Sequence, residues 1–137
     1  MFKNCVLLDT LTGTSITVSN NNASYMFASC NSLLYSIIED NLITNFSSIT
    51  NFTGFMFNRI YNTNTTVHLN LYSSATTLNR AFTTYLYTDR GYTTYTQPSG
   101  ITITFIGNIP SGVTNLERAF DLRNNYVMFE DWDTLIS

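Results

Sequence analysis

Few residues of this 137-residue chain carry reactive side chains, and their spacing argues against catalysis. His68 is the only histidine, and no Ser or Cys stands in a recognisable nucleophile setting, so a catalytic triad has little support. Glu39 and Asp40 are adjacent, as are Glu130 and Asp131, and neighbouring carboxylates in a loop rarely face each other across a substrate. Solvated charge is the simpler interpretation, with an oxygen-lined Ca²⁺ site as the alternative. The sequence therefore predicts a protein that is not an enzyme and needs no cofactor or metal.

The two cysteines occupy matching places in a phrase that occurs twice. MFKNCVLL, from Met1 to Leu8, returns as MFASCNSL, from Met26 to Leu33, and places Cys5 and Cys30 in register. CxxC spacing is absent and neither Cys has a nearby His, which argues against a metal site. The burial preference of Cys favours two buried free thiols, and a disulfide between the two positions is the alternative.

The residues best suited to binding lie in an aromatic stretch from 83 to 100. The turn signal Asp89-Arg90-Gly91 has alternating residues on both sides, which predicts an inserted β-hairpin. Tyr offers a rigid, amphipathic contact surface at low entropic cost, and its ring can also stack on a sugar. A hairpin whose tyrosines pack on their own scaffold is the alternative. The candidate binding residues are Tyr85, Tyr87, Tyr92, Tyr95, Gln97 and Trp132.

The composition limits the classes of partner. Charged residues make up 11% of the chain, against about 25% in a typical domain, whereas Thr, Asn and Ser number 22, 17 and 13. A net charge of -3 with a single lysine argues against nucleic acid, which binds to clustered Lys and Arg. No stretch approaches the roughly 18 apolar residues of a membrane span. The apolar run after Lys3 ends at Asp9, so we expect no signal peptide in the chain as given.

Around these residues the sequence predicts repeating units with a phenylalanine anchor. The anchors are Phe2, Phe27, Phe57, Phe82 and Phe120. Alternating apolar residues before an anchor predict strands, as in Val67, Leu69, Leu71 and in Ile101, Ile103, Phe105. Short helices are expected to end at the anchors, because Val113, Leu116 and Phe120 fall at i, i+3 and i+7, a spacing that recurs within residues 75–82. We expect the last four anchors to be buried in equivalent positions, with Leu33, Leu69, Leu71, Ile101, Ile103 and Leu116 in the same core.

Two of these units resemble a known family. The segments SSITNFTGFMFN, from Ser47 to Asn58, and ASYMFASCNSL, from Ala23 to Leu33, are similar to the BspA-type leucine-rich repeat of bacterial surface proteins. That repeat carries a Val-Thr-Asn-hydrophobic-Ser-x-Met-Phe phrase followed by Cys and Leu. The resemblance implies a stacked repeat fold and a place at a cell surface.

These observations predict one domain, residues 1–137, built from about four units with a hairpin inserted at 83–100. Its fold class is an α/β repeat rich in β-structure: a short leucine-rich-repeat-like solenoid with a parallel sheet and short helices or turns. The expected function is that of a structural or protein-interaction module in a cell-surface or virion-type extracellular assembly, with other protein chains as partners. The alternative is a carbohydrate-binding adhesin module that uses the tyrosine-rich hairpin to bind glycans.

Overall fold

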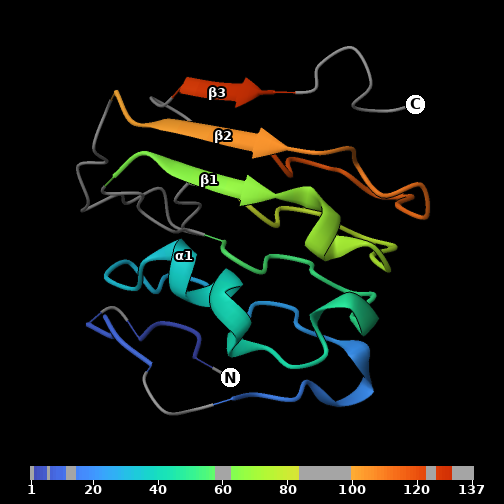
Figure 1. Ribbon diagram of the computed structural model, residues 1–137, viewed down its shortest axis with the longest axis horizontal. Coiled ribbons are helices and arrows are strands. Elements are labelled where there is room, and N and C mark those ends of the chain that lie inside the picture. The colour runs from blue at the N-terminus through green and yellow to red at the C-terminus, as the bar shows by residue number, and fades with distance from the viewer. Residues whose placement is uncertain are drawn as a thin grey trace, which may run out of the picture.

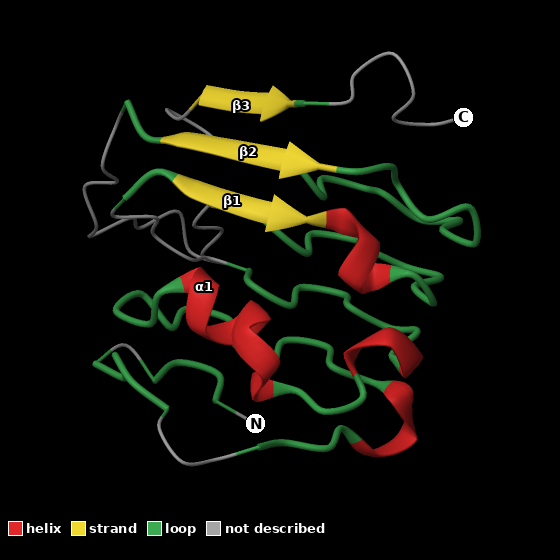
Figure 2. Ribbon diagram, viewed as in Figure 1, coloured by secondary structure: helices red, strands yellow, loops and turns green. Residues whose placement is uncertain are grey.

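A small parallel sheet with a few short helices makes up the fold. The computed structural model describes residues 2–5, 7–11, 15–57, 63–83, 100–122 and 126–130. The strands β1 (Thr65–His68), β2 (Thr102–Ile106) and β3 (Tyr126–Phe129) form one parallel sheet in the order β1-β2-β3, with α1 (Tyr35–Ile37) beyond β1 (Figures 1 and 2). The prediction of a parallel sheet is confirmed. Within the described ranges, no helix is long and apolar enough to cross a membrane.

The sheet follows the period-2 pattern of the sequence. Val67 pairs with Phe105, and Ile103 pairs with Val127 in the next strand. Val67, Ile103 and Phe105 are fully buried, because alternate side chains of a strand point to one face of the sheet. β1 is shorter than the alternation suggested. The chain turns into a 3-10 helix at Leu69, which leaves Leu71 only partly buried.

The remaining helical elements are short and lie mostly before residue 50. Tyr35–Ile37 is one turn of α-helix that continues into the π-helix η2 (Ile38–Leu42). Three 3-10 turns, η1 (Ser19–Asn21), η3 (Phe46–Ser48) and η4 (Leu69–Tyr72), redirect the chain between extended segments (Figure 2). None of these elements is a helix that ends at a phenylalanine anchor.

The predicted helices at residues 113–120 and 75–82 are wrong. Both segments are turns, and each holds one residue of a row of single parallel bridges that joins Asn22, Asn51, Thr77 and Asn115. Amides of residues 75–82 donate to carbonyls of residues 113–120: Leu78 N–H donates to the Asn115 carbonyl at 2.9 Å, and Arg80 N–H donates to the Glu117 carbonyl at 2.9 Å. These backbone groups bond to residues far away in sequence and not to residues four positions along the chain, so the segments are not helical despite their i, i+3, i+7 spacing. Leu116, expected in the core, is 36% exposed.

Four chain segments share one local conformation in this row. The third residue after each bridge residue has a positive φ: Tyr25 (54°), Gly54 (60°), Arg80 (54°) and Arg118 (53°). The side-chain oxygen of the bridge residue accepts the amide two positions on, as from Asn51 Oδ1 to Thr53 N at 2.9 Å. The same turn follows Asn22, Thr77 and Asn115. An Asn or Thr side chain therefore starts each turn.

The row of bridges places Met56, and not the predicted anchor Phe57, in the position equivalent to Phe27. The fifth residue after each bridge residue is Phe27, Met56, Phe82 or Phe120. Met56 is fully buried, whereas Phe57 is partly exposed and its ring lies edge-on to that of Tyr25 at 6.1 Å. Phe27 and Phe82 are buried as predicted, whereas Phe57 is not an anchor and Phe120 is only partly buried. Of the other expected core residues, Leu33, Leu69 and Ile103 are fully buried and Ile101 is partly buried.

Both cysteines are free thiols, but only one is buried. Cys30 is fully buried and its thiol donates to the Phe2 carbonyl oxygen at 2.8 Å. The expected burial of Cys5 is wrong: the segment 2–5 bonds to residues 26–28 through its backbone, and the Cys5 side chain is exposed. The alternative of a disulfide between the two cysteines is not found.

Candidate functional site

The predicted binding residues cannot be placed. Tyr85, Tyr87, Tyr92, Tyr95, Gln97 and Trp132 all lie outside the described residues, as does most of the predicted hairpin at 83–100. At the ends of this stretch, Thr83 is buried and Gly100 is exposed. The hairpin and its tyrosines stay predictions.

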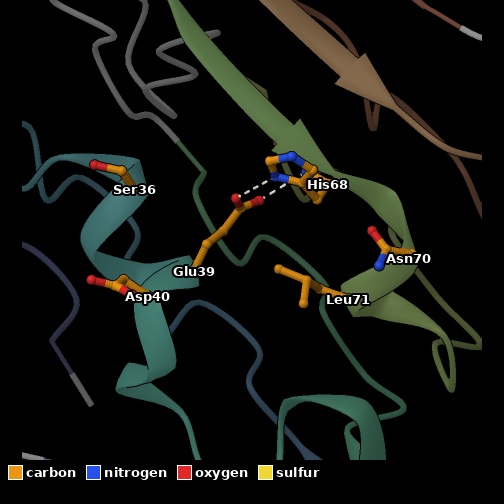
Figure 3. A pocket seen from close by; sticks show the side chains of 6 residues that line it. All are labelled: Ser36, Glu39, Asp40, His68, Asn70 and Leu71. Atoms are coloured by element: carbon orange, nitrogen blue, oxygen red, sulfur yellow. Dashed lines mark hydrogen bonds and ion pairs between the residues drawn. The ribbon is translucent and has the colours of Figure 1, made fainter.

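The described residues bring together a different pair, Glu39 and His68. Glu39 Oε2 lies 2.8 Å from His68 Nδ1, and Glu39 Oε1 accepts the backbone N–H of His68 at 2.8 Å (Figure 3). The Glu39 side chain is 12% exposed, whereas that of His68 is 47% exposed. His68 points away from the core, because its neighbour Val67 in β1 faces the core.

Glu39 reaches this position because its segment is helical. Tyr35, Ile38 and Leu42 are buried along one side of α1 and η2, which places Glu39 on another side, toward β1. The expectation that Glu39 carries a solvated charge in a loop is therefore wrong. The i, i+3, i+7 spacing of the three buried residues is the sequence signal that could have found this helix.

The carboxylate of Glu39 orients the imidazole of His68, but the described residues place no nucleophile beside the ring. Nδ1 faces Glu39, so Nε2 is the ring nitrogen available to other groups. The side chains of Ser36 and Asp40 point away from the ring in Figure 3. No hydroxyl or thiol of the described residues hydrogen-bonds to His68, and no three metal-binding side chains among them are gathered closely enough to hold an ion.

A groove runs between the helical segment and β1, on both sides of the Glu39–His68 contact. One hollow, of about 380 Å³, is lined by Ser36, Glu39, Asp40, His68, Asn70 and Leu71 (Figure 3). A second, of about 290 Å³, is lined by Leu34, Tyr35, Ser36, Glu39, Thr63, Asn64, Thr65, Thr66 and His68. Because the two hollows share Ser36, Glu39 and His68, we treat them as one groove, the β1 groove. Apart from the Glu39–His68 pair and Asp40, its lining is uncharged.

The solvent face of the sheet is a second exposed surface. Register places Thr66, Thr104 and Met128 in one row across the three strands, and Thr102 beside Tyr126 in the next. Tyr126 is 66% exposed and Met128 is 56% exposed. We call this surface the sheet face; it carries aromatic, thioether and hydroxyl groups and no charge in these two rows.

No protein-family model, curated protein or solved structure matches this chain. The resemblance to BspA-type leucine-rich repeats therefore stays a prediction from the two motifs.

Proposed function

We propose that this chain is a short solenoid that serves as a non-catalytic module and docks other protein chains through its sheet face. The observation that carries the proposal is the pair of large exposed side chains, Tyr126 and Met128, in rows of neutral residues. Protein interfaces are enriched in Tyr and Met and depleted of charge at their centre. Such a surface also loses little solvation when a partner covers it.

The solenoid part of the proposal rests on repeated geometry. Parallel pairing runs through β1, β2 and β3 in one column, and through the single bridges from Asn22 to Asn115 in another. Units that each contact only their neighbours are typical of stacked repeats, which often present their sheet to a ligand. The cell-surface or virion-type setting remains the expectation drawn from the resemblance and the low charge.

Site-specific crosslinking tests the sheet face. A photoreactive phenylalanine analogue at position 128 should crosslink to a single partner species, either another protein or a second copy of this chain. The same analogue at Leu7, another highly exposed apolar residue, is the matched control. Tyr126→Ser should reduce the crosslink at least tenfold. Equal yields from positions 7 and 128, together with a monomer in light scattering at high concentration, would reject the proposal.

Carbohydrate is the second candidate partner, because Tyr126 presents its ring beside Thr102, a neutral hydrogen-bonding side chain. Glycan-array binding that disappears in Tyr126→Ser would favour this function. A silent array together with a specific protein crosslink would exclude it. The tyrosines of the predicted hairpin are the other surface to test on the same array.

A further inference from the structure

The N-terminal segment, residues 2–5, adds a layer to the stacked segments at the end opposite β3 (Figure 1). The N–H of Phe2 donates to the carbonyl of Met26 at 2.9 Å, and the N–H of Asn4 donates to the carbonyl of Ala28 at 2.8 Å. Backbone bonds from alternate residues therefore hold this segment to the next layer, as in a parallel ladder.

The N-terminal segment repeats the conformation of the layer it covers. Asn4 and Ser29 both have a positive φ, of 64° and 58°. The N–H of Cys5 donates to the carbonyl three residues before it at 3.1 Å, and the N–H of Cys30 does the same at 3.2 Å. The two cysteines therefore occupy equivalent positions in adjacent layers.

The two thiol side chains also point in the same direction. The Cys5 sulfur lies 4.0 Å from the carbonyl oxygen two residues before it, and the Cys30 sulfur lies 3.8 Å from the equivalent oxygen of its own layer. The Cys30 thiol donates to the Phe2 carbonyl, the same oxygen that accepts the N–H of Cys5. Paired segments lie about 4.8 Å apart, which falls within the range of about 4.4–6.8 Å between Cα atoms that a disulfide requires.

We infer that Cys5 and Cys30 are a redox pair, and that their oxidation to a disulfide clamps the N-terminal segment onto the layer it covers. Both are thiols in the structure, and only that of Cys5 is exposed. An oxidising extracellular setting would keep the pair as a disulfide, and a reducing one as two thiols. The inference does not depend on the proposed function, because it involves neither the sheet face nor a partner protein.

A low-molecular-weight disulfide, such as oxidised glutathione, is the oxidant that this arrangement suits. The exposed Cys5 reacts first: its thiolate attacks one sulfur of oxidised glutathione, releases one glutathione thiolate and leaves a mixed disulfide. The thiolate of Cys30 then attacks the Cys5 sulfur from the adjacent layer, and the second glutathione leaves as the Cys5–Cys30 bond forms. The protons of the two protein thiols end on the two glutathione molecules, and two electrons pass from the protein to the oxidant.

Peptide mapping without reduction, after equilibration in glutathione redox buffers, tests the pairing. The matched control is Cys5→Ser/Leu7→Cys, which moves the exposed thiol two positions along the chain, to a site that is 86% exposed. The wild-type chain should yield a Cys5–Cys30 disulfide, with at least ten times less glutathione adduct on Cys5. The control should stop at a glutathione adduct on position 7, with Cys30 unmodified.

Amide hydrogen exchange tests the clamp. Oxidation should slow the exchange of the Phe2 and Asn4 amides at least tenfold, because the segment can no longer separate from the layer it covers. This slowing should exceed any change at the amides of Leu78 and Arg80, which bond to another layer toward the opposite end of the stack.

Two results would overturn the inference. One is a wild-type chain that stops at a glutathione adduct on Cys5, or that forms only disulfide-linked dimers through it, because the two sulfurs would then be out of reach of each other. The other is a Cys5–Cys30 disulfide that leaves the exchange of Phe2 and Asn4 unchanged, because the bond would not act as a clamp. Neither result would affect the proposed docking at the sheet face.

Discussion

Replacing Phe55 with Ala should destabilise the protein far more than replacing its near neighbour Phe57. Phe55 is fully buried, and its ring centroid lies 5.4 Å from that of Phe27 and 5.2 Å from that of Phe52. It also contacts the rings of Phe46 and Tyr72 at 6.1 and 6.2 Å. Phe55 therefore links several segments of the core at one point.

The expected magnitudes follow from burial. A buried Phe→Ala substitution costs about 3–5 kcal/mol, through lost transfer free energy and the cavity left behind. Phe57 is partly exposed, and its one ring contact among the described residues is edge-on to Tyr25, so Phe57→Ala should cost about 1 kcal/mol. The difference of about 2–4 kcal/mol is a large part of the roughly 5–15 kcal/mol that stabilises a typical domain.

Urea denaturation followed by circular dichroism measures both free energies of unfolding. Phe57→Ala is the matched control, because it removes the same side chain two positions away. The comparison requires similar m-values, which show that the denatured states expose comparable surface. If Phe57→Ala costs as much as Phe55→Ala, Phe57 is an anchor, as the sequence repeat suggested, and the register described here is wrong.

Three further predictions follow from single side chains. Asn45→Ala should cost about 2 kcal/mol and speed exchange of the Val18 amide, because the Asn45 amide group bonds to both the N–H and the C=O of Val18 at 2.9 Å. Arg118→Gly should raise the free energy of unfolding by up to about 1 kcal/mol in urea titrations, because it relieves a positive φ at an exposed position; a loss would contradict the left-handed turn. Under native conditions a thiol reagent should label exposed Cys5 rapidly and buried Cys30 only after unfolding, as mass spectrometry of the digested protein would report.

The strands could be predicted from the sequence because their signal is local. Alternation around Val67 and from Ile103 to Phe105 identified the residues that face the core. Parallel pairing followed from the wider repeat, since equivalent strands in stacked units run in the same direction. Of the predicted fold, the parallel sheet is confirmed, and the solenoid stays a prediction.

Helices could not be located, because one spacing fits two different structures. Val113, Leu116 and Phe120 share the i, i+3, i+7 spacing of Tyr35, Ile38 and Leu42, yet only the second set is helical. In the first set a left-handed residue, Arg118, interrupts any helix, and carbonyls of the segment accept amides from the distant residues 78–82. The glycine at position 54 was the local clue to this turn. Aligning the other segments on it would have placed Met56, not Phe57, in register with Phe27.

The Glu39–His68 contact could not be predicted from the sequence for a related reason. The two residues are 29 positions apart, and their meeting depends on a helix that stands where neighbouring segments are extended. Neither residue lies in a motif that would associate it with the other. Only the stacking order of the segments brings them together.

Side chains complete the backbone pairing where extended segments stop, which gives the abundance of Asn and Thr a structural reason. Asn45 pairs with Val18 just beyond the bridge between Ile16 and Ile43, and Asn64 accepts the Thr102 amide just before β1 pairs with β2. Glu39 does the same for His68. At Thr66, on the same edge of β1, no side chain among the described residues fills this role.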